Sequence, residues 1–135
     1  MILCDAGPLV ALIDTADTHH VECTAILPRL SGPLITTWPC LTEAMHLLGR
    51  KFGFKQQRDL WHLIELEAII LHSPSVVESQ RMRDLMDQYQ NIPMDLADAS
   101  LVAAAEVRGL TRIFTLDTDF RVYRILGSGL FEVVP

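Results

Sequence analysis

Short apolar runs alternate along this chain with longer stretches whose apolar residues recur every three or four positions. Continuous runs of this length are typical of buried strands, and the wider spacing is typical of helices with one buried face. The runs predict strands over residues 1–4, 34–37, 69–72, 112–116 and 131–134. The spaced stretches predict helices over residues 8–13, 21–30, 41–52, 55–66, 75–89 and 96–108.

The alternation of strands with helices indicates the fold class. It is typical of an α/β fold in which a parallel sheet is covered by helices on both faces. We therefore expect a single domain over residues 1–135, with a central parallel sheet of about five strands. The stretch 96–108 is apolar on nearly every side, which predicts a helix that lies mostly inside the fold.

Four acidic residues occupy equivalent places in this pattern. Two follow predicted strands, and two lie where we expect the first turns of helices. In chain order they are Asp5, Glu43, Asp98 and Asp117. Right-handed crossovers bring strand ends and the following helix starts to one edge of a parallel sheet, which is where ligands bind in α/β folds. We therefore expect the four carboxylates to converge at that edge.

Each of these acids also has an ordinary structural role open to it. Asp5 precedes a helix with Pro8 in its first turn, and aspartate is a common helix N-cap. An acid in a first turn, as expected for Glu43, favours the helix dipole. Asp95 and Asp98 have the spacing of a capping box, so we interpret Asp95 first as a helix cap. The burial expected for Asp98 favours a second role, because a buried charge needs a partner or a metal.

Composition narrows the function classes. Half of the 135 residues are hydrophobic, and the net charge of −6 argues against a general nucleic-acid coat. A carboxylate cluster that binds metal keeps a nuclease possible, since the metal reverses the local charge. The three cysteines form no C-x-x-C pair, which predicts reduced thiols and no zinc site. No apolar run reaches membrane-spanning length and no signal peptide is recognisable, so we expect a cytoplasmic protein without a membrane segment.

An all-carboxylate site favours phosphoryl chemistry on a phosphodiester. Oxygen ligands suit Mg²⁺ or Mn²⁺ rather than zinc, and such ions activate water and bind phosphate. A phosphatase that uses Asp5 as its nucleophile would need an acid two residues later, where Gly7 stands. A phospho-receiver would need a lysine after a late strand, and the only lysines are Lys51 and Lys55.

Four segments, in this order, make the chain resemble a PIN domain, specifically the toxin-type ribonucleases of the VapC kind. They are I-L-C-D-A-G-P-L-V-A-L at 2–12, L-T-E-A at 41–44, D-L-A-D-A-S-L-V-A-A-A at 95–105 and T-L-D-T-D-F at 115–120. The resemblance covers essentially the whole chain. It implies a PIN-like three-layer α/β/α sandwich and hydrolysis of RNA with Mg²⁺ or Mn²⁺ as cofactor.

The resemblance also implies roles for individual residues. It makes the four acids catalytic residues and metal ligands, and Thr115 matches a small hydroxyl residue near the site. Asp119 is either an additional acid or a residue that caps the turn before Phe120. Ala6 departs from the family pattern, because many members carry Thr or Ser there. The chain therefore lacks one hydroxyl that could orient Asp5.

The last expectations concern the basic residues that could bind RNA and the partners of the protein. Candidate phosphate contacts are Arg50, Lys51, Lys55, Arg58, Arg121 and Arg124, with a solvated basic surface as the alternative for each. The resemblance implies a cognate antitoxin and a homodimer. Two functions remain open from the sequence: a metal-dependent ribonuclease toxin, and a PIN-fold module that binds RNA or protein without cleaving it.

Overall fold

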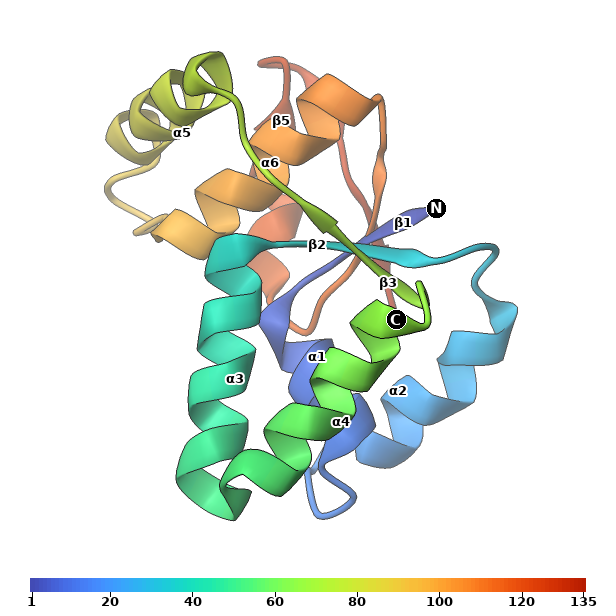
Figure 1. Cartoon of the computed structure of the whole chain (residues 1–135). Helices are drawn as coiled ribbons and strands as arrows, with labels where there is room; N and C mark the ends of the chain where they lie inside the picture. Colours follow the sequence, from blue (N-terminus) through green and yellow to red (C-terminus); the bar gives the residue numbers. More distant parts are fainter.

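A five-stranded parallel sheet forms the middle of the molecule (Figure 1). The structure is a computed structural model that describes all residues from Met1 to Pro135. The strands run in the order β3-β2-β1-β4-β7. Their bounds are β1 Ile2–Cys4, β2 Leu34–Thr37, β3 Ile69–His72, β4 Arg112–Phe114 and β7 Glu132–Val134. Every neighbouring pair is parallel, so all five carboxyl ends lie at one edge.

Six α-helices cover the two faces of the sheet. Four lie on one face: α1 Ala6–Ile13, α2 His20–Ile26, α3 Trp38–Phe52 and α4 Phe54–Glu65. Two lie on the other face: α5 Val76–Gln88 and α6 Leu96–Arg108. Two 3₁₀ helices, η1 Leu27–Arg29 and η2 Thr118–Arg121, and a small hairpin of β5 Arg124–Ile125 with β6 Gly129–Leu130 complete the chain. This arrangement confirms the predicted three-layer α/β/α fold with a five-stranded parallel sheet.

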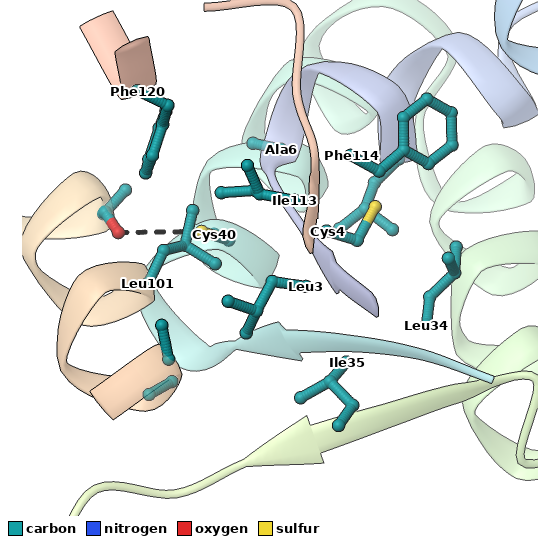
Figure 2. Close-up of a cluster of buried hydrophobic side chains, with 14 of the residues drawn as sticks. Leu3, Cys4, Ala6, Leu34, Ile35, Cys40, Leu101, Ile113, Phe114 and Phe120 are labelled. Carbon is teal, nitrogen blue, oxygen red and sulfur yellow. Dashed lines mark hydrogen bonds between the residues drawn. The ribbon is translucent and has the colours of Figure 1, made fainter. Parts of the chain in front are cut away.

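The core lies between these layers and holds the central strand rigidly. All three residues of β1 are buried, and Leu3 lies among Ile35 of β2, Ile113 of β4 and Leu101 of α6 (Figure 2). All three cysteines are buried and free. Because β1 is enclosed on every side, its carboxyl end, where Asp5 follows, is fixed in position.

Helix α6 confirms the expected burial over most of its length. Its residues from Ala97 to Ala105 are all buried. Leu96 and Val107, at the two ends of the helix, are 51% and 61% exposed. The apolar pattern alone does not reveal these exposed ends, because they depend on where the neighbouring layers stop.

Several predicted boundaries are wrong by a few residues. Helix α3 begins at Trp38 instead of residue 41, with Pro39 in its first turn. Glu43 therefore lies in the second turn, not the first. Strand β4 ends at Phe114, which leaves Thr115 in the loop that follows. The β5–β6 hairpin was not predicted from the sequence.

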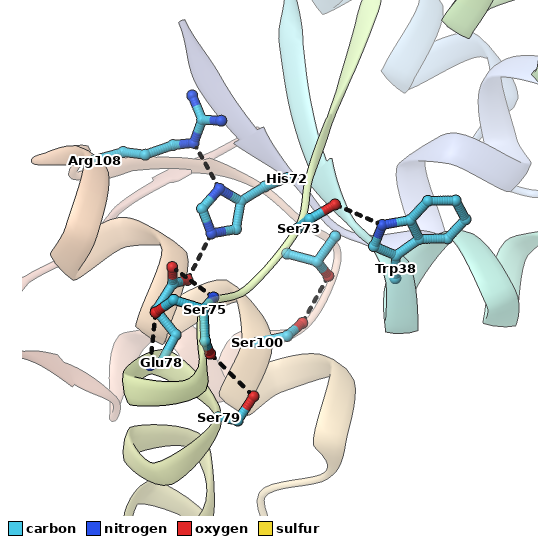
Figure 3. A network of polar contacts seen from close by, with 9 residues as sticks. Trp38, His72, Ser73, Ser75, Glu78, Ser79, Ser100 and Arg108 are labelled. Atoms are coloured by element: carbon cyan, nitrogen blue, oxygen red, sulfur yellow. Dashed lines mark hydrogen bonds and ion pairs between the residues drawn. The ribbon is translucent and has the colours of Figure 1, made fainter.

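A polar network around the buried side chains of His72 and Glu78 ties the second helical layer to the sheet (Figure 3). Nε2 of His72 in β3 lies 2.6 Å from the carboxylate of Glu78 in α5, and Arg108 in α6 donates to Nδ1 of His72 at 2.9 Å. Since Nδ1 accepts this hydrogen bond, the proton of the ring lies on Nε2 and points to Glu78. The network satisfies polar groups that the core would otherwise leave unpaired.

No helix in the structure combines the length and the apolar character needed to cross a bilayer.

Candidate functional site

The four predicted acids line a single pocket at the carboxyl edge of the sheet. The pocket has a volume of about 280 Å³, and its other lining residues are Ala6, Gly7, Asp95 and Leu116. Asp5 and Asp117 come from the ends of β1 and β4, which pair in parallel through Cys4 and Phe114. Glu43 projects from α3 and Asp98 from α6. Four separate segments of the chain thus supply one acidic pocket.

Both carboxylate oxygens of Asp5 are held by the protein. Oδ1 accepts a hydrogen bond of 2.7 Å from the backbone N–H of Ala6, so Asp5 also caps α1. Oδ2 accepts a hydrogen bond of 2.8 Å from the hydroxyl of Thr115. Burial raises the pKa of Asp5, and the Thr115 hydrogen bond opposes this shift. The backbone of Ala6 and the side chain of Thr115 therefore orient Asp5 without a hydroxyl at position 6.

Thr115 connects two of the acids. While its hydroxyl donates to Asp5, its oxygen accepts a hydrogen bond of 3.0 Å from the backbone N–H of Asp117. Oδ1 of Asp117 in turn accepts a hydrogen bond of 2.9 Å from the backbone N–H of Asp119, so Asp117 caps η2. Asp119 does not line the acidic pocket. The N-cap of η2 is Asp117, and Asp119 lies inside η2, so its role as an additional acid stays a prediction.

Asp98 is the most strongly perturbed acid of the pocket. Its Oδ2 accepts a hydrogen bond of 3.0 Å from the hydroxyl of Tyr123. The backbone N–H of Asp98 donates a hydrogen bond of 2.8 Å to Oδ1 of Asp95. In return, Oδ2 of Asp98 accepts a hydrogen bond of 3.4 Å from the backbone N–H of Asp95. This capping box confirms Asp95 as the N-cap of α6. Burial and the nearby charge of Asp95 raise the pKa of Asp98 to about 7.

Glu43 differs from the other three acids because its side chain is free. The residue is exposed on α3, and its carboxylate accepts no hydrogen bond within the protein. Partial desolvation of the carboxyl group, with the charges of Asp5 and Asp95, raises the pKa of Glu43. The side chain can therefore rotate at the mouth of the pocket, whereas Asp5 and Asp98 are fixed.

Comparison with known proteins identifies the family. The PIN domain family model matches residues 2–126. The chain belongs to the PIN domain family. No curated protein matches the sequence significantly.

Solved structures share the fold of this PIN domain. VapC20 of Mycobacterium tuberculosis, a sarcin-ricin loop cleaving toxin, has a TM-score of 0.83 at 18% identity, with both chains covered completely. A toxin–antitoxin complex from Klebsiella pneumoniae has a TM-score of 0.70 at 19% identity, covering 100% of this chain and 97% of the other. VapBC2 from Rickettsia felis, bound to a DNA fragment from its promoter, has a TM-score of 0.69 at 14% identity, again with both chains covered completely.

Two residues of the PIN site were missed from the sequence. Tyr123 lies in the segment that follows the last acidic motif, and a buried tyrosine hydroxyl usually has a hydrogen-bond partner, which is the signal that could have revealed it. Cys40 of α3 places its thiol 3.8 Å from Oδ1 of Asp5. Burial and the charge of Asp5 raise the pKa of the Cys40 thiol, so the thiol keeps its proton, for which Oδ1 of Asp5 and the backbone carbonyl of Ala97 at 3.9 Å are the two acceptors.

The predicted basic residues are only partly near the acids. Arg121 lines a second pocket of about 190 Å³, which shares Leu116 and Asp117 with the acidic pocket. Arg124 instead donates to the backbone carbonyls of residues 121, 122 and 123. Its side chain stabilises the end of η2 and is not free to bind a phosphate through these donors.

The other predicted basic residues lie at the tip of the α3–α4 hairpin. Lys51 donates to the carboxylate of Asp14 at 2.9 Å, and the guanidinium of Arg58 stacks over the ring of Phe54. Arg50 lies seven residues beyond Glu43 on the same helix, about 10 Å along its axis. None of these residues lines the acidic pocket, so any role in binding RNA would be at a distance from it.

The four acidic side chains are of the chemical type that binds a hard divalent cation. They are carboxylates, which Mg²⁺ and Mn²⁺ prefer, and burial, with a smaller contribution from mutual repulsion, raises the pKa values of Asp5, Glu43 and Asp98. A cation would relieve that repulsion. In this structure, however, no three Asp, Glu, His or Cys side chains are gathered tightly enough to hold a metal ion. Binding would therefore require side-chain movement, for which Glu43 is free.

Proposed function

We propose that this PIN domain is a Mg²⁺- or Mn²⁺-dependent endoribonuclease that hydrolyses RNA phosphodiester bonds, and that it is the toxin of a type II toxin–antitoxin pair. The main support is the pocket in which Asp5, Glu43, Asp98 and Asp117 meet at the carboxyl edge of a PIN fold. The structures that share this fold include a toxin that cleaves the sarcin-ricin loop and toxin–antitoxin complexes.

In this proposal the four acids are the metal ligands. A divalent cation bound there supplies water activation and neutralises charge on the phosphate. Thr115 keeps Asp5 turned toward the pocket, and Tyr123 keeps one oxygen of Asp98 in place. Asp98 must release any proton that its raised pKa retains before it can bind a cation. Arg121, on the neighbouring pocket, contacts a phosphate of the same strand and positions it.

The partners in this proposal are an RNA substrate, a cognate antitoxin and a second copy of the chain in a homodimer, all in the cytoplasm. The toxin–antitoxin complexes among the structural relatives support the antitoxin. The remaining alternative is a PIN-fold module that binds RNA or protein without cleaving it. Its specific support is that the acids are not preassembled around a metal position.

A cleavage assay with and without Mg²⁺ or Mn²⁺ tests the ribonuclease. Wild type is compared with Asp5→Asn and Asp98→Asn, which keep the side-chain shape but remove a charge from the pocket. Asp59→Asn is the matched control, because Asp59 is exposed on α4 and does not line the pocket. We expect metal-dependent cleavage by wild type and Asp59→Asn, and its loss in the two pocket variants.

Two results would count against the ribonuclease proposal or its assigned ligands. RNA bound but left intact with either metal would favour the binding module. Equal cleavage by Asp5→Asn and wild type would remove Asp5 from the ligand set. Induced expression tests the toxin role separately: growth should stop with wild type and continue with Asp98→Asn. Normal growth with an active wild-type enzyme, in a strain without an antitoxin, would contradict that role.

A further inference from the structure

A third, more apolar pocket adjoins the acidic one. Its volume is about 570 Å³, within the range of roughly 300–1,000 Å³ that small-molecule sites occupy. It shares Glu43 and Asp95 with the acidic pocket, so the two hollows lie side by side. Its remaining lining residues are Trp38, Pro39, Thr42, His46, Leu96 and Ala97. We call this hollow the Trp38 pocket.

The indole of Trp38 is both exposed and held in place. The residue is 44% exposed at the first position of α3. Its Nε1 donates a hydrogen bond of 2.9 Å to the hydroxyl of Ser73, which directly follows β3 (Figure 3). A large aromatic ring anchored in this way loses little further freedom on binding. Stacking of an unpaired base on such a ring is an established source of affinity for single-stranded nucleic acid.

The charges around the Trp38 pocket select which part of an RNA can enter. Glu43 and Asp95 stand on the side shared with the acidic pocket, and no lysine or arginine lines the hollow. A phosphate would be repelled there. A nucleobase is uncharged, and carboxylates accept hydrogen bonds from exocyclic amino groups such as that of cytosine. Apolar contact from Leu96, which is 51% exposed, can cover the rest of a base.

We propose that the Trp38 pocket binds one unpaired nucleobase next to the phosphodiester bond that is cut, with Trp38 as its stacking surface. This inference rests on the proposed ribonuclease function, because it takes the scissile phosphate to lie at the adjoining acidic pocket. Trp38 is then a specificity-determining residue, and the base that it accepts fixes the sequence preference at one position beside the cut.

Cleavage of a random-sequence pool of single-stranded oligoribonucleotides, with the cut ends sequenced, tests the pocket. Trp38→Ala should lower kcat/KM by about 5- to 100-fold and flatten the base preference at one position beside the cut. Trp38→Phe should retain most of the activity, because a smaller ring still stacks. Trp61→Ala is the matched control: Trp61 is 39% exposed on α4 and does not line the pocket. Thermal unfolding of each variant shows that it is folded.

A binding measurement separates this inference from the ribonuclease proposal. In a Trp61→Phe background Trp38 is the only tryptophan, and its fluorescence should be quenched by the oligoribonucleotides A6, C6 or U6 in the presence of Mg²⁺. Quenching without cleavage by wild type would overturn the ribonuclease and leave the base pocket standing. Neither quenching nor cleavage would overturn both.

Two further results would overturn the base pocket alone. One is a Trp38→Ala enzyme with the rate and base preference of the Trp61→Ala control. The other is quenching by a peptide containing arginine and leucine when none of the oligoribonucleotides quenches, which would make the hollow a protein-docking site.

Discussion

The hydroxyl of Tyr123 donates a hydrogen bond of 3.0 Å to Oδ2 of Asp98, the acid whose pKa burial and Asp95 raise to about 7. Tyr123 is completely buried and packs edge-to-face against Tyr89 and Phe120. The aromatic cluster of Tyr89, Phe120 and Tyr123 thus fixes the orientation of an acid on α6. Because the hydroxyl has no other partner, its removal affects the acidic pocket directly.

Tyr123→Phe should therefore impair the site more than it impairs the fold. The variant keeps the ring packing and loses one hydrogen bond, which costs about 1 kcal/mol in the free energy of unfolding. Cleavage should fall, because Asp98 is no longer held. Tyr89→Phe is the control, since its hydroxyl accepts from the backbone N–H of Arg124 and touches no acid. Equal cleavage by the two variants would show that the Asp98 contact is only structural.

Thr115→Val should reduce activity by about 10- to 100-fold, the usual effect of removing a residue that orients a metal ligand. Valine has the shape of threonine but leaves Oδ2 of Asp5 and the backbone N–H of Asp117 without their partner. Thr115→Ser restores the hydroxyl and should recover most of the rate. The measurement is kcat/KM with saturating Mn²⁺. A serine variant as inactive as the valine variant would show that packing of the methyl group matters, not the hydroxyl.

The stability of the metal-free protein should depend on pH through Asp98. Its pKa is about 7 in the folded state against a usual value of 3.8, so the folded state binds this proton more tightly than the unfolded state. The resulting stabilisation is complete below about pH 4 and is lost as the pH rises to 7 and above. Asp98→Asn should remove this loss and be the more stable protein at pH 8. Thermal unfolding from pH 5 to 8, in the presence of a chelator, measures how the stability of each protein changes with pH. The control variant Asp59→Asn should follow wild type.

With Mg²⁺ or Mn²⁺ bound at pH 8, wild type should become more stable than Asp98→Asn. A ligand that binds only the folded state stabilises it by mass action, by about 2.7 kcal/mol at a concentration 100 times its dissociation constant. Wild type should gain melting temperature on addition of either metal at pH 8, and the gain should disappear with a chelator. Asp98→Asn should gain less, because it lacks one ligand charge. An equal gain in both proteins would place the bound cation elsewhere.

Much of the fold follows from local sequence patterns, which can be recognised in short segments of the chain without knowledge of the rest. Apolar runs placed all five strands of the sheet, and the spacing of Asp95 and Asp98 predicted the capping box that begins α6. The alternation of strands and helices then led to the expectation that four distant acids meet at one edge. Hydrophobic periodicity and helix capping act over a few residues, and parallel topology follows from their order.

The tertiary structure decided which side chains touch. Thr115 and Asp5 are 110 positions apart, Trp38 and Ser73 are 35 apart, and Tyr123 and Asp98 are 25 apart. It also decided that Arg124 is occupied by backbone carbonyls while Arg121 borders the acids, although both follow the same motif. Contacts of this kind depend on how complete layers pack against one another, and no local pattern in the chain encodes that packing.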